Sequence, residues 1–231
     1  MSRDGIRSAG LVPFSTIDFP GRLAAVLFTQ GCPLRCRYCH NPHLRRRDEA
    51  SGLDWDSTLA WLRRRKGLLD AVVFSGGEPT IHPALADALS DVRDLGFATG
   101  LHTAGMAPER LARVLPLLDW VGLDVKAPFA RYAEITGSGS SGARARRALD
   151  AVLASGIGHE LRTTMHPALL GPEDLIDIAK DLRARGLHDW VLQTFRPAGC
   201  IDEVLMARCE PYALDSLLSA LRQLVPGVVV R

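Results

Sequence analysis

Short apolar runs alternate with amphipathic stretches along most of the chain. Runs rich in Val, Leu, Ala and Phe predict β-strands at residues 23–29, 71–75, 97–103, 120–125, 160–164 and 190–195. Between and after them, apolar residues recur with helical spacing, which predicts helices over residues 56–65, 83–95, 108–117, 143–154, 172–185 and 212–224. Residues 228–230 predict a short last strand.

This alternation predicts an α/β fold. Strands that are near-continuous apolar runs are typical of parallel sheets covered on both faces, and successive βα units imply right-handed crossovers. Six such units are too few for a closed barrel of eight strands, so we predict a partial (β/α)6 TIM-like barrel. We expect a single domain over residues 1–231, in which the Gly- and Ser-rich residues 137–142 form a flexible surface loop.

Composition and charge limit the kinds of protein that this chain can be. The chain has 231 residues, of which 47% are hydrophobic and 23% charged, as suits one globular domain with a sizeable core. The net charge of +2 does not demand a nucleic-acid partner, and the basic residues 45–47 and 63–66 are expected to be solvated. We see no secretory leader and no apolar run of membrane-spanning length, and five cysteines do not form a secreted disulfide framework. We therefore expect a cytoplasmic protein that does not bind a membrane.

Three cysteines, Cys32, Cys36 and Cys39, lie in one short run with the spacing C-x3-C-x2-C, GCPLRCRYCHNP. Iron–sulfur clusters are usually held by four thiolates. Three thiolates can hold a cubane at three corners and leave one iron open to a substrate or cofactor. The alternative is a zinc knuckle, which needs a fourth ligand such as His40 or His43.

The cysteine spacing is identified as the signature of radical S-adenosylmethionine (SAM) enzymes. The runs FSTIDFPG (14–21), LFTQGC (27–32) and CHNP (39–42) resemble the activating proteins of anaerobic ribonucleotide reductase. The resemblance implies a 4Fe–4S cluster that Cys32, Cys36 and Cys39 hold, and SAM that is cleaved reductively to a 5′-deoxyadenosyl radical. It also implies that this radical makes a glycyl radical on a partner, anaerobic ribonucleoside-triphosphate reductase, with a flavodoxin-type reductant.

Polar and glycine residues gather where the predicted strands end, which is where α/β barrels carry their chemistry. Gly76, Gly77 and Glu78 resemble the family's GGE motif, whose carbonyls and carboxylate would accept hydrogen bonds from the SAM amino group. Asp124 and Lys126 lie two residues apart and so point to the same side. The resemblance places Lys126 against the SAM carboxylate and gives Asp124 a monovalent cation to bind.

Five further residues complete the predicted SAM site. Tyr38 matches an aromatic position near the adenine, and Thr103 is carried over from the family motif at the third strand. Arg162, a charge in an apolar strand, needs an anion such as the SAM carboxylate or Glu160. Gln193 and Arg196 are placed to reach the ribose or the partner protein.

Two features depart from the family pattern or lie outside it. Many activases have Asp-Thr-Asn-Gly where this chain has His102, Thr103, Ala104 and Gly105, which puts the cation site in question. His102 is expected to be a core histidine at a strand end. Cys200 and Cys209 are expected to be bystanders outside the cluster motif.

Three other functions remain open from the sequence. The chain also fits an activase of the pyruvate formate-lyase type, or a radical SAM enzyme that acts on a small molecule. From a different class, it fits a non-catalytic metal-binding or electron-transfer module, with a fully ligated cluster or zinc. The strand-end residues count against that last alternative.

Overall fold

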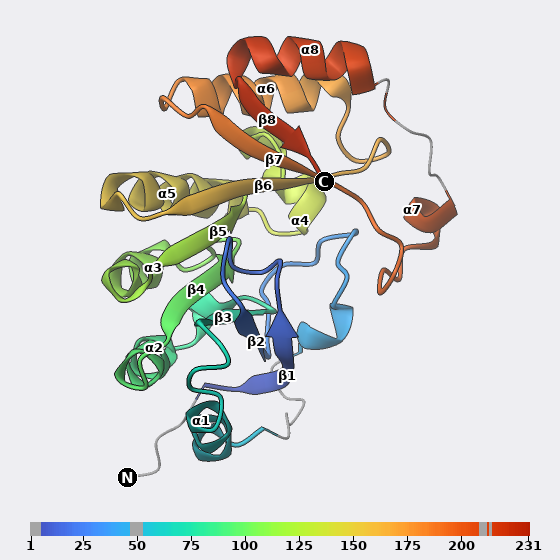
Figure 1. Ribbon diagram of the computed structural model, residues 1–231. Helices are drawn as coiled ribbons and strands as arrows, with labels where there is room; N and C mark the ends of the chain where they lie inside the picture. The colour runs from blue at the N-terminus through green and yellow to red at the C-terminus, as the bar shows by residue number, and fades with distance from the viewer. Residues whose placement is uncertain (1–5, 47–52, 208–211, 213) are drawn as a thin grey trace. The chain divides into compact units, whose positions relative to one another are not determined.

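The computed structural model describes residues 6–46, 53–207, 212 and 214–231 (Figure 1). These residues fold as two compact units, each assembled from separate stretches of the chain. The first unit draws on the described residues within 1–33, 43–122 and 147–159, and the second on those within 34–42, 123–146 and 160–231. The prediction of a single domain stays a prediction.

Strands of the first unit neighbour one another in chain order: β1 (Ser8–Ser15), β2 (Ala24–Thr29), β3 (Ala71–Gly76) and β4 (Ala98–Thr103). β1 runs antiparallel to β2, while β2, β3 and β4 are parallel. β2 and β3 pair without a break in register, from Ala24 opposite Ala71 to Thr29 opposite Gly76. The two strands therefore end next to each other. The segments that follow these two strands therefore start side by side.

Helices of this unit follow their strands, as βα units require: α1 (Trp55–Arg63), α2 (Leu85–Asp94) and α3 (Pro108–Val114), with the 3-10 turns η2 (Pro79–Ile81) and η3 (Leu115–Leu117). α1 begins after Asp54, whose carboxylate accepts a hydrogen bond from the Ser57 amide at 2.8 Å and so caps the helix. α1 buries Leu59 and Leu62, and α2 packs against β4 and α3.

The core of the first unit forms between β2, β3 and the start of β5 (Trp120–Asp124). It buries small and branched side chains against two aromatic rings, in a cluster of Phe19, Ala24, Val26, Ala71, Val73 and Trp120. The rings of Phe19 and Trp120 lie 5.6 Å apart between centroids. These apolar contacts hold the loop that joins β1 to β2 against the strands.

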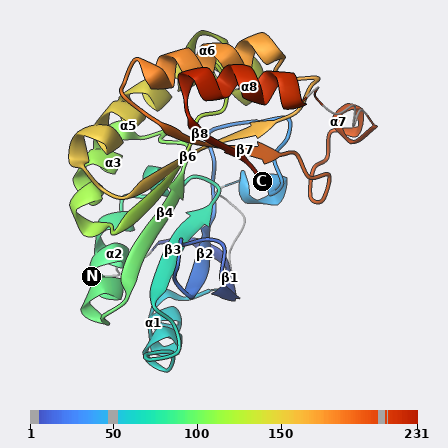
Figure 2. The ribbon, with the colours of Figure 1, turned by 45° about the horizontal axis from the view of Figure 1, so that its top comes forward.

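In the second unit the strands β6 (His159–Met165), β7 (Asp189–Thr194) and β8 (Gly227–Val230) are parallel neighbours. Its helices are α4 (Tyr132–Thr136), the first part of α5 (Ser141–Ser155), α6 (Pro172–Arg183), α7 (Glu203–Ala207) and α8 (Leu214–Leu224), with the 3-10 turn η4 (Phe129–Arg131). α6 and α8 lie side by side next to β7 and β8 (Figures 1 and 2). None of the described helices has the length and apolar character to cross a bilayer.

The predicted strands and helices are confirmed, with ends displaced by at most a few residues. The expected flexible loop at residues 137–142 is wrong in its second half, because α5 already begins at Ser141. Ser141 is buried and shares a 2.7 Å hydrogen bond with Thr136, and a Cβ on Gly142 would lie 2.2 Å from the carbonyl oxygen of Phe129. The small residues there serve close packing. The antiparallel strand β1 and the five-residue helices α4 and α7 were not predicted.

Candidate cofactor site

The cysteine run forms a loop between β2 and the 3-10 turn η1 (Pro42–Leu44). Cys36 is buried, whereas Cys32 and Cys39 are partly exposed, and none of the three forms a disulfide. The Cys39 amide donates to the Cys36 carbonyl at 3.2 Å, which closes a turn, and the Arg35 amide donates to the Thr136 carbonyl at 2.7 Å. The second and third cysteines therefore lie on a backbone segment that α4 holds in the second unit.

Three free thiols in one short loop have the donor chemistry of an iron–sulfur cluster site. Within the part of the chain that the structure describes, no three His, Cys, Asp or Glu side chains converge as ligands of one ion. In a cubane each thiolate binds a different iron, so the three sulfurs need not converge on one point. The zinc knuckle stays an alternative prediction from the sequence.

Lys126 lies in the second unit against Tyr38, the residue before the last cysteine of the loop. Its ammonium nitrogen lies 5.7 Å from the centre of the Tyr38 ring and 2.8 Å from Oδ2 of Asp124. Only 9% of Lys126 and 6% of Tyr38 are exposed. A cation above an aromatic face is attracted to the ring. The structure thus brings together three residues that the sequence predicted for the SAM site.

The charge of Lys126 is secured by its neighbours. Burial alone would lower the pKa of this ammonium, but the adjacent Asp124 carboxylate raises that pKa well above its ordinary value. Burial raises the pKa of Tyr38 well above its ordinary value, so its hydroxyl stays protonated at neutral pH. Lys126 therefore carries a fixed positive charge beside the neutral ring of Tyr38.

Tyr132, at the start of α4, fixes the backbone between Asp124 and Lys126. The Lys126 amide donates to the Tyr132 hydroxyl oxygen at 2.9 Å, and that hydroxyl donates to the Asp124 carbonyl at 3.1 Å. Tyr132 is completely buried. Sequence reasoning missed it, because nothing in the sequence around residue 132 marks an aromatic that returns to a strand end.

Gly76 and Gly77, in the first unit, are required by the protein's own packing. Gly76 has φ +113°, and a Cβ there would lie 2.3 Å from the Thr29 amide nitrogen. A Cβ on Gly77 would lie 2.2 Å from the Gly31 carbonyl oxygen. The glycines let the start of the cysteine loop lie directly against the end of β3. The predicted approach of a ligand to these glycines stays a prediction.

Glu78 is a buried hydrogen-bond acceptor, with 1% of its surface exposed. Its Oε1 accepts from the hydroxyls of Thr80 and Thr103, both at 2.5 Å, and from the Thr80 amide at 3.1 Å. Its Oε2 accepts from the Ala104 amide at 2.8 Å. Burial raises the Glu78 pKa above its ordinary value, although these hydrogen bonds oppose the shift. Glu78 therefore ties the turn after β3 to the end of β4.

His102 is half-buried at the end of β4, as expected of a core histidine. Its Nε2 lies 2.8 Å from the Asp18 carbonyl oxygen, and its ring meets Trp120 edge-on with centroids 5.5 Å apart. Thr103 donates to Glu78 and accepts from the Gly105 amide at 2.8 Å. Neither residue adds a carboxylate at this strand end, and the cation that was predicted with Asp124 stays a prediction.

The remaining predicted residues belong to β6, β7 and the segment after β7. Arg162 pairs with Glu160, Nε to Oε1 at 2.8 Å, and Glu160 also meets Arg231 at 2.9 Å. Of the two anions considered for Arg162, the structure therefore provides Glu160. Gln193 is half-buried opposite Thr164, and Arg196 is exposed.

Comparison with known families identifies the class of protein. The model of the radical SAM superfamily matches residues 26–184, which include the cysteine loop, the Gly-Gly-Glu turn and the Asp124–Lys126 pair. This chain belongs to the radical SAM superfamily. Membership implies a 4Fe–4S cluster and SAM as cofactors, and the three thiols of the cysteine loop fit that cluster. The expectation of a radical enzyme is confirmed.

Proteins of similar sequence indicate which family within the superfamily this chain belongs to. A protein named as a glycyl-radical enzyme activating enzyme, from Methanocaldococcus jannaschii, is 32% identical over 208 residues, which cover 84% of this chain and 82% of that protein. The pyruvate formate-lyase-activating enzyme of Clostridium pasteurianum is 38% identical over 143 residues, or 59% of this chain and 58% of that enzyme. Within the superfamily, the chain belongs with the glycyl-radical enzyme activating enzymes. Enzymes of this family act on a glycyl-radical protein.

Solved structures agree on the fold. Streptococcus suis SuiB bound to its precursor peptide SuiA matches 89% of this chain with a TM-score of 0.67 and 14% identity. Native anSMEcpe with bound AdoMet matches 72% with a TM-score of 0.59 and 15% identity. The chain spans about half the length of each, 48% and 49%. The predicted α/β fold of the radical SAM type, a partial TIM barrel, is confirmed.

Proposed function

We propose that this enzyme generates the glycyl radical of anaerobic ribonucleoside-triphosphate reductase. The observation that carries the proposal is the buried Lys126 ammonium, which faces the Tyr38 ring inside the cysteine loop. A cation next to a cluster-binding loop suits the carboxylate of SAM. The choice of partner is supported by residues 14–21, 27–32 and 39–42, which resemble the activating proteins of that reductase.

Cys32, Cys36 and Cys39 hold the cluster at three of its irons in this proposal. When bound, the cluster supplies the electron that splits SAM into methionine and a 5′-deoxyadenosyl radical, which takes hydrogen from a glycine of the partner. The proposed electron donor is a flavodoxin-type protein, and the proposed compartment is the cytoplasm. The protein around the cofactors binds SAM, orients it and keeps water away.

Lys126 binds the carboxylate of SAM and keeps its hydrogen bond to Asp124. An ammonium has three donors, so one can stay on Asp124 while another meets the ligand. Tyr38 presents its ring to the adenine side of the site. The Gly76 and Gly77 carbonyls accept from the amino group of SAM, together with Oε2 of Glu78, which accepts one hydrogen bond in the described part of the protein.

Five residues take supporting roles in the proposal. Thr103 orients Glu78 through their 2.5 Å hydrogen bond. Asp124 fixes Lys126 and contributes to a monovalent cation site. Arg162, held by Glu160, lends positive charge near the SAM carboxylate, while Gln193 and Arg196 reach the ribose or the partner.

The pyruvate formate-lyase type is the second candidate, since an activating enzyme of that name is 38% identical over part of the chain. The test is to mix the reconstituted, reduced protein and SAM with each partner under anaerobic conditions. Electron paramagnetic resonance (EPR) then records the glycyl-radical doublet. We expect the doublet with the anaerobic ribonucleotide reductase and none with a reductase whose radical glycine is replaced by alanine. A doublet with pyruvate formate-lyase alone, or with neither protein, contradicts the proposed partner.

A further inference from the structure

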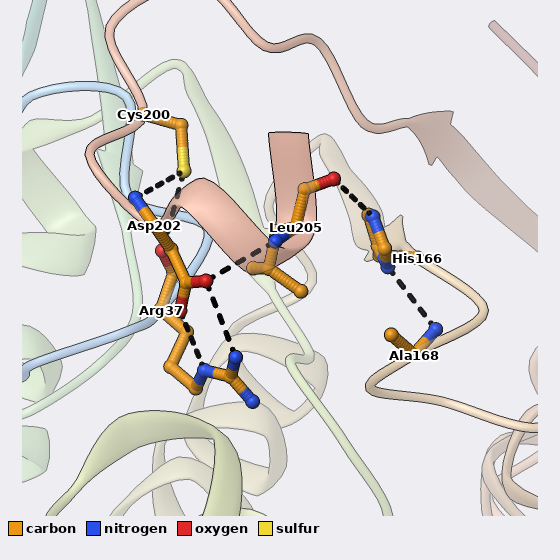
Figure 3. A network of polar contacts seen from close by, with 6 residues as sticks. All are labelled: Arg37, His166, Ala168, Cys200, Asp202 and Leu205. Atoms are coloured by element: carbon orange, nitrogen blue, oxygen red, sulfur yellow. Dashed lines mark hydrogen bonds and ion pairs between the residues drawn. The ribbon is translucent and has the colours of Figure 1, made fainter. Parts of the chain in front are cut away.

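The residues that follow β7 cross the cysteine loop within the second unit (Figure 3). We call residues 199–205 the strap. Asp202 of the strap accepts two hydrogen bonds from Arg37, which lies between Cys36 and Cys39: Oδ2 from Nε at 2.7 Å and Oδ1 from Nη2 at 3.2 Å. This bidentate geometry fixes both the distance and the orientation of the guanidinium.

The strap also holds the Arg37 backbone. The Cys200 thiol donates to the Arg37 carbonyl, with sulfur and oxygen 3.4 Å apart, and accepts from the Asp202 amide at 3.5 Å. Cys200 is 7% exposed, so this thiol bond is shielded from water. Arg37 is therefore held at its guanidinium and at its peptide group by two residues of one segment.

Gly199 brings the strap against the backbone of His40, the residue that follows Cys39. A Cβ at this position would lie 2.2 Å from the His40 carbonyl oxygen, and Gly199 has φ +82°. Only glycine permits both the conformation and the approach. The strap thus contacts Arg37, which follows the second cysteine, and His40, which follows the third.

The far end of the strap is anchored to the end of β6. Asp202 Oδ1 accepts from the Leu205 amide at 3.1 Å and so caps α7. The Leu205 carbonyl lies 3.0 Å from Nε2 of His166, whose Nδ1 accepts from the Ala168 amide at 3.1 Å. Because Nδ1 accepts, Nε2 carries the proton and donates to Leu205. The chain of contacts in Figure 3 therefore runs from β6 to the cysteine loop.

We propose that Asp202 and Cys200 are positioning residues for the cluster: they fix the backbone between its second and third cysteine ligands. Groups that orient metal ligands govern how firmly the metal is held, and hydrogen bonding and exposure tune an iron–sulfur cluster. The inference goes beyond the proposed function. It rests on the cluster that the family membership implies, and not on the identity of the partner protein.

The first test is Asp202→Asn, which removes the charge but keeps a good helix cap. The measurement is the rate at which an iron chelator strips the anaerobically reconstituted protein, together with the EPR spectrum of the reduced cluster. We expect iron loss about tenfold faster, at the lower end of the usual effect of such groups, with a shifted or broadened EPR signal. The matched control is Asp177→Asn, which breaks an exposed pair with Lys180 on α6, and it should behave as wild type.

Further variants separate positioning from general loosening of the fold. Cys200→Ala should speed iron loss, whereas Cys200→Ser, which retains a donor, should restore most of the wild-type rate. Arg37→Gln combined with Asp202→Asn should lose iron no faster than either single variant, because both remove the same contact. Wild-type iron loss and EPR spectra in Asp202→Asn and Cys200→Ala overturn the proposal. None of these readouts uses the partner protein, so they remain valid if the proposed reductase is not activated.

Discussion

Lys126 and Asp124 form a 2.8 Å ion pair whose ammonium side also faces the ring of Tyr38. The carboxylate remains 39% exposed while the lysine side chain is 11% exposed. The positive charge is therefore the more deeply placed of the two, and it lies on the side of the cysteine loop. In the proposed SAM site this ammonium is the group that binds the carboxylate of the ligand.

Lys126→Met should weaken SAM binding by about tenfold or more, because a hydrogen bond to a charged group contributes roughly 1.5–3 kcal/mol. The measurement is a titration of the anaerobically reconstituted protein with SAM, followed by the change in the EPR spectrum of the reduced cluster. Lys180→Met, which removes an exposed lysine of α6, is the control and should bind as wild type does. Unchanged SAM affinity in Lys126→Met contradicts the assigned role.

Tyr132→Phe should lower the free energy of unfolding by about 1–2 kcal/mol, since it leaves the buried Lys126 amide without its hydroxyl acceptor. It should also weaken SAM binding, because the same hydroxyl orients the strand end that carries Lys126. Tyr212→Phe likewise removes a hydrogen bond to a carbonyl, that of Leu170. This control should lose stability but keep its affinity for SAM. Denaturant melts and SAM titrations distinguish the two variants, and equal SAM affinities would refute the positioning by Tyr132.

Gly77→Ala should prevent correct folding or yield insoluble protein, because its Cβ would lie 2.2 Å from a backbone oxygen that cannot move aside. Gly139→Ala is the matched control, since a Cβ there meets nothing within 4 Å. We expect the control to be soluble with a Tm within a few degrees of wild type. A Gly77→Ala protein with a wild-type Tm shows that β3 and the cysteine loop lie further apart than described.

Glu78→Gln should lower stability at every pH by about 1–3 kcal/mol, because the new amide NH2 faces backbone and hydroxyl donors. The pH dependence of this stability difference follows from the raised pKa of the Glu78 carboxyl. The wild-type carboxyl binds its proton more tightly when folded, so its contribution is fully present below its ordinary pKa of 4.5 and is lost as pH rises through the higher folded pKa. The stability gap between wild type and variant should therefore narrow as pH rises through that interval. Chemical denaturation across this pH range measures the gap, and a gap that widens is inconsistent with the raised pKa.

The apolar runs identified the parallel strands because their residues are buried on both faces, as in Ala71–Gly76. β1 was not predicted, since it contains Pro13 and most of its residues are half-buried or exposed, as an antiparallel edge strand permits. The start of α5 was not predicted as helix because its Gly-Ser composition indicates a loop. The packing of Gly142 against Phe129 and the hydrogen bond between Ser141 and Thr136 stabilise the helix start there.

For the site, the family resemblance together with the short spacing predicted the cysteines and the Asp124–Lys126 pair, since those residues are close in sequence. The partners that fix them are remote: Asp202 meets Arg37 across 165 residues, and Thr103 meets Glu78 across 25. Neither hydrophobic periodicity nor a short motif predicts contacts between residues so far apart in the sequence. The sequence also indicated Glu78 as a ligand acceptor, whereas its four hydrogen bonds show how much of it serves the protein itself.

The most direct test of radical SAM chemistry in this protein is the 5′-deoxyadenosine that it forms. The protein is reconstituted anaerobically with iron and sulfide, reduced with dithionite and incubated with SAM, and the nucleoside is quantified by chromatography. We expect 5′-deoxyadenosine and methionine in equal amounts from wild type, and no 5′-deoxyadenosine from Cys36→Ala. Wild-type protein with an intact reduced cluster that forms no 5′-deoxyadenosine contradicts this expectation, as does product formation that persists in Cys36→Ala.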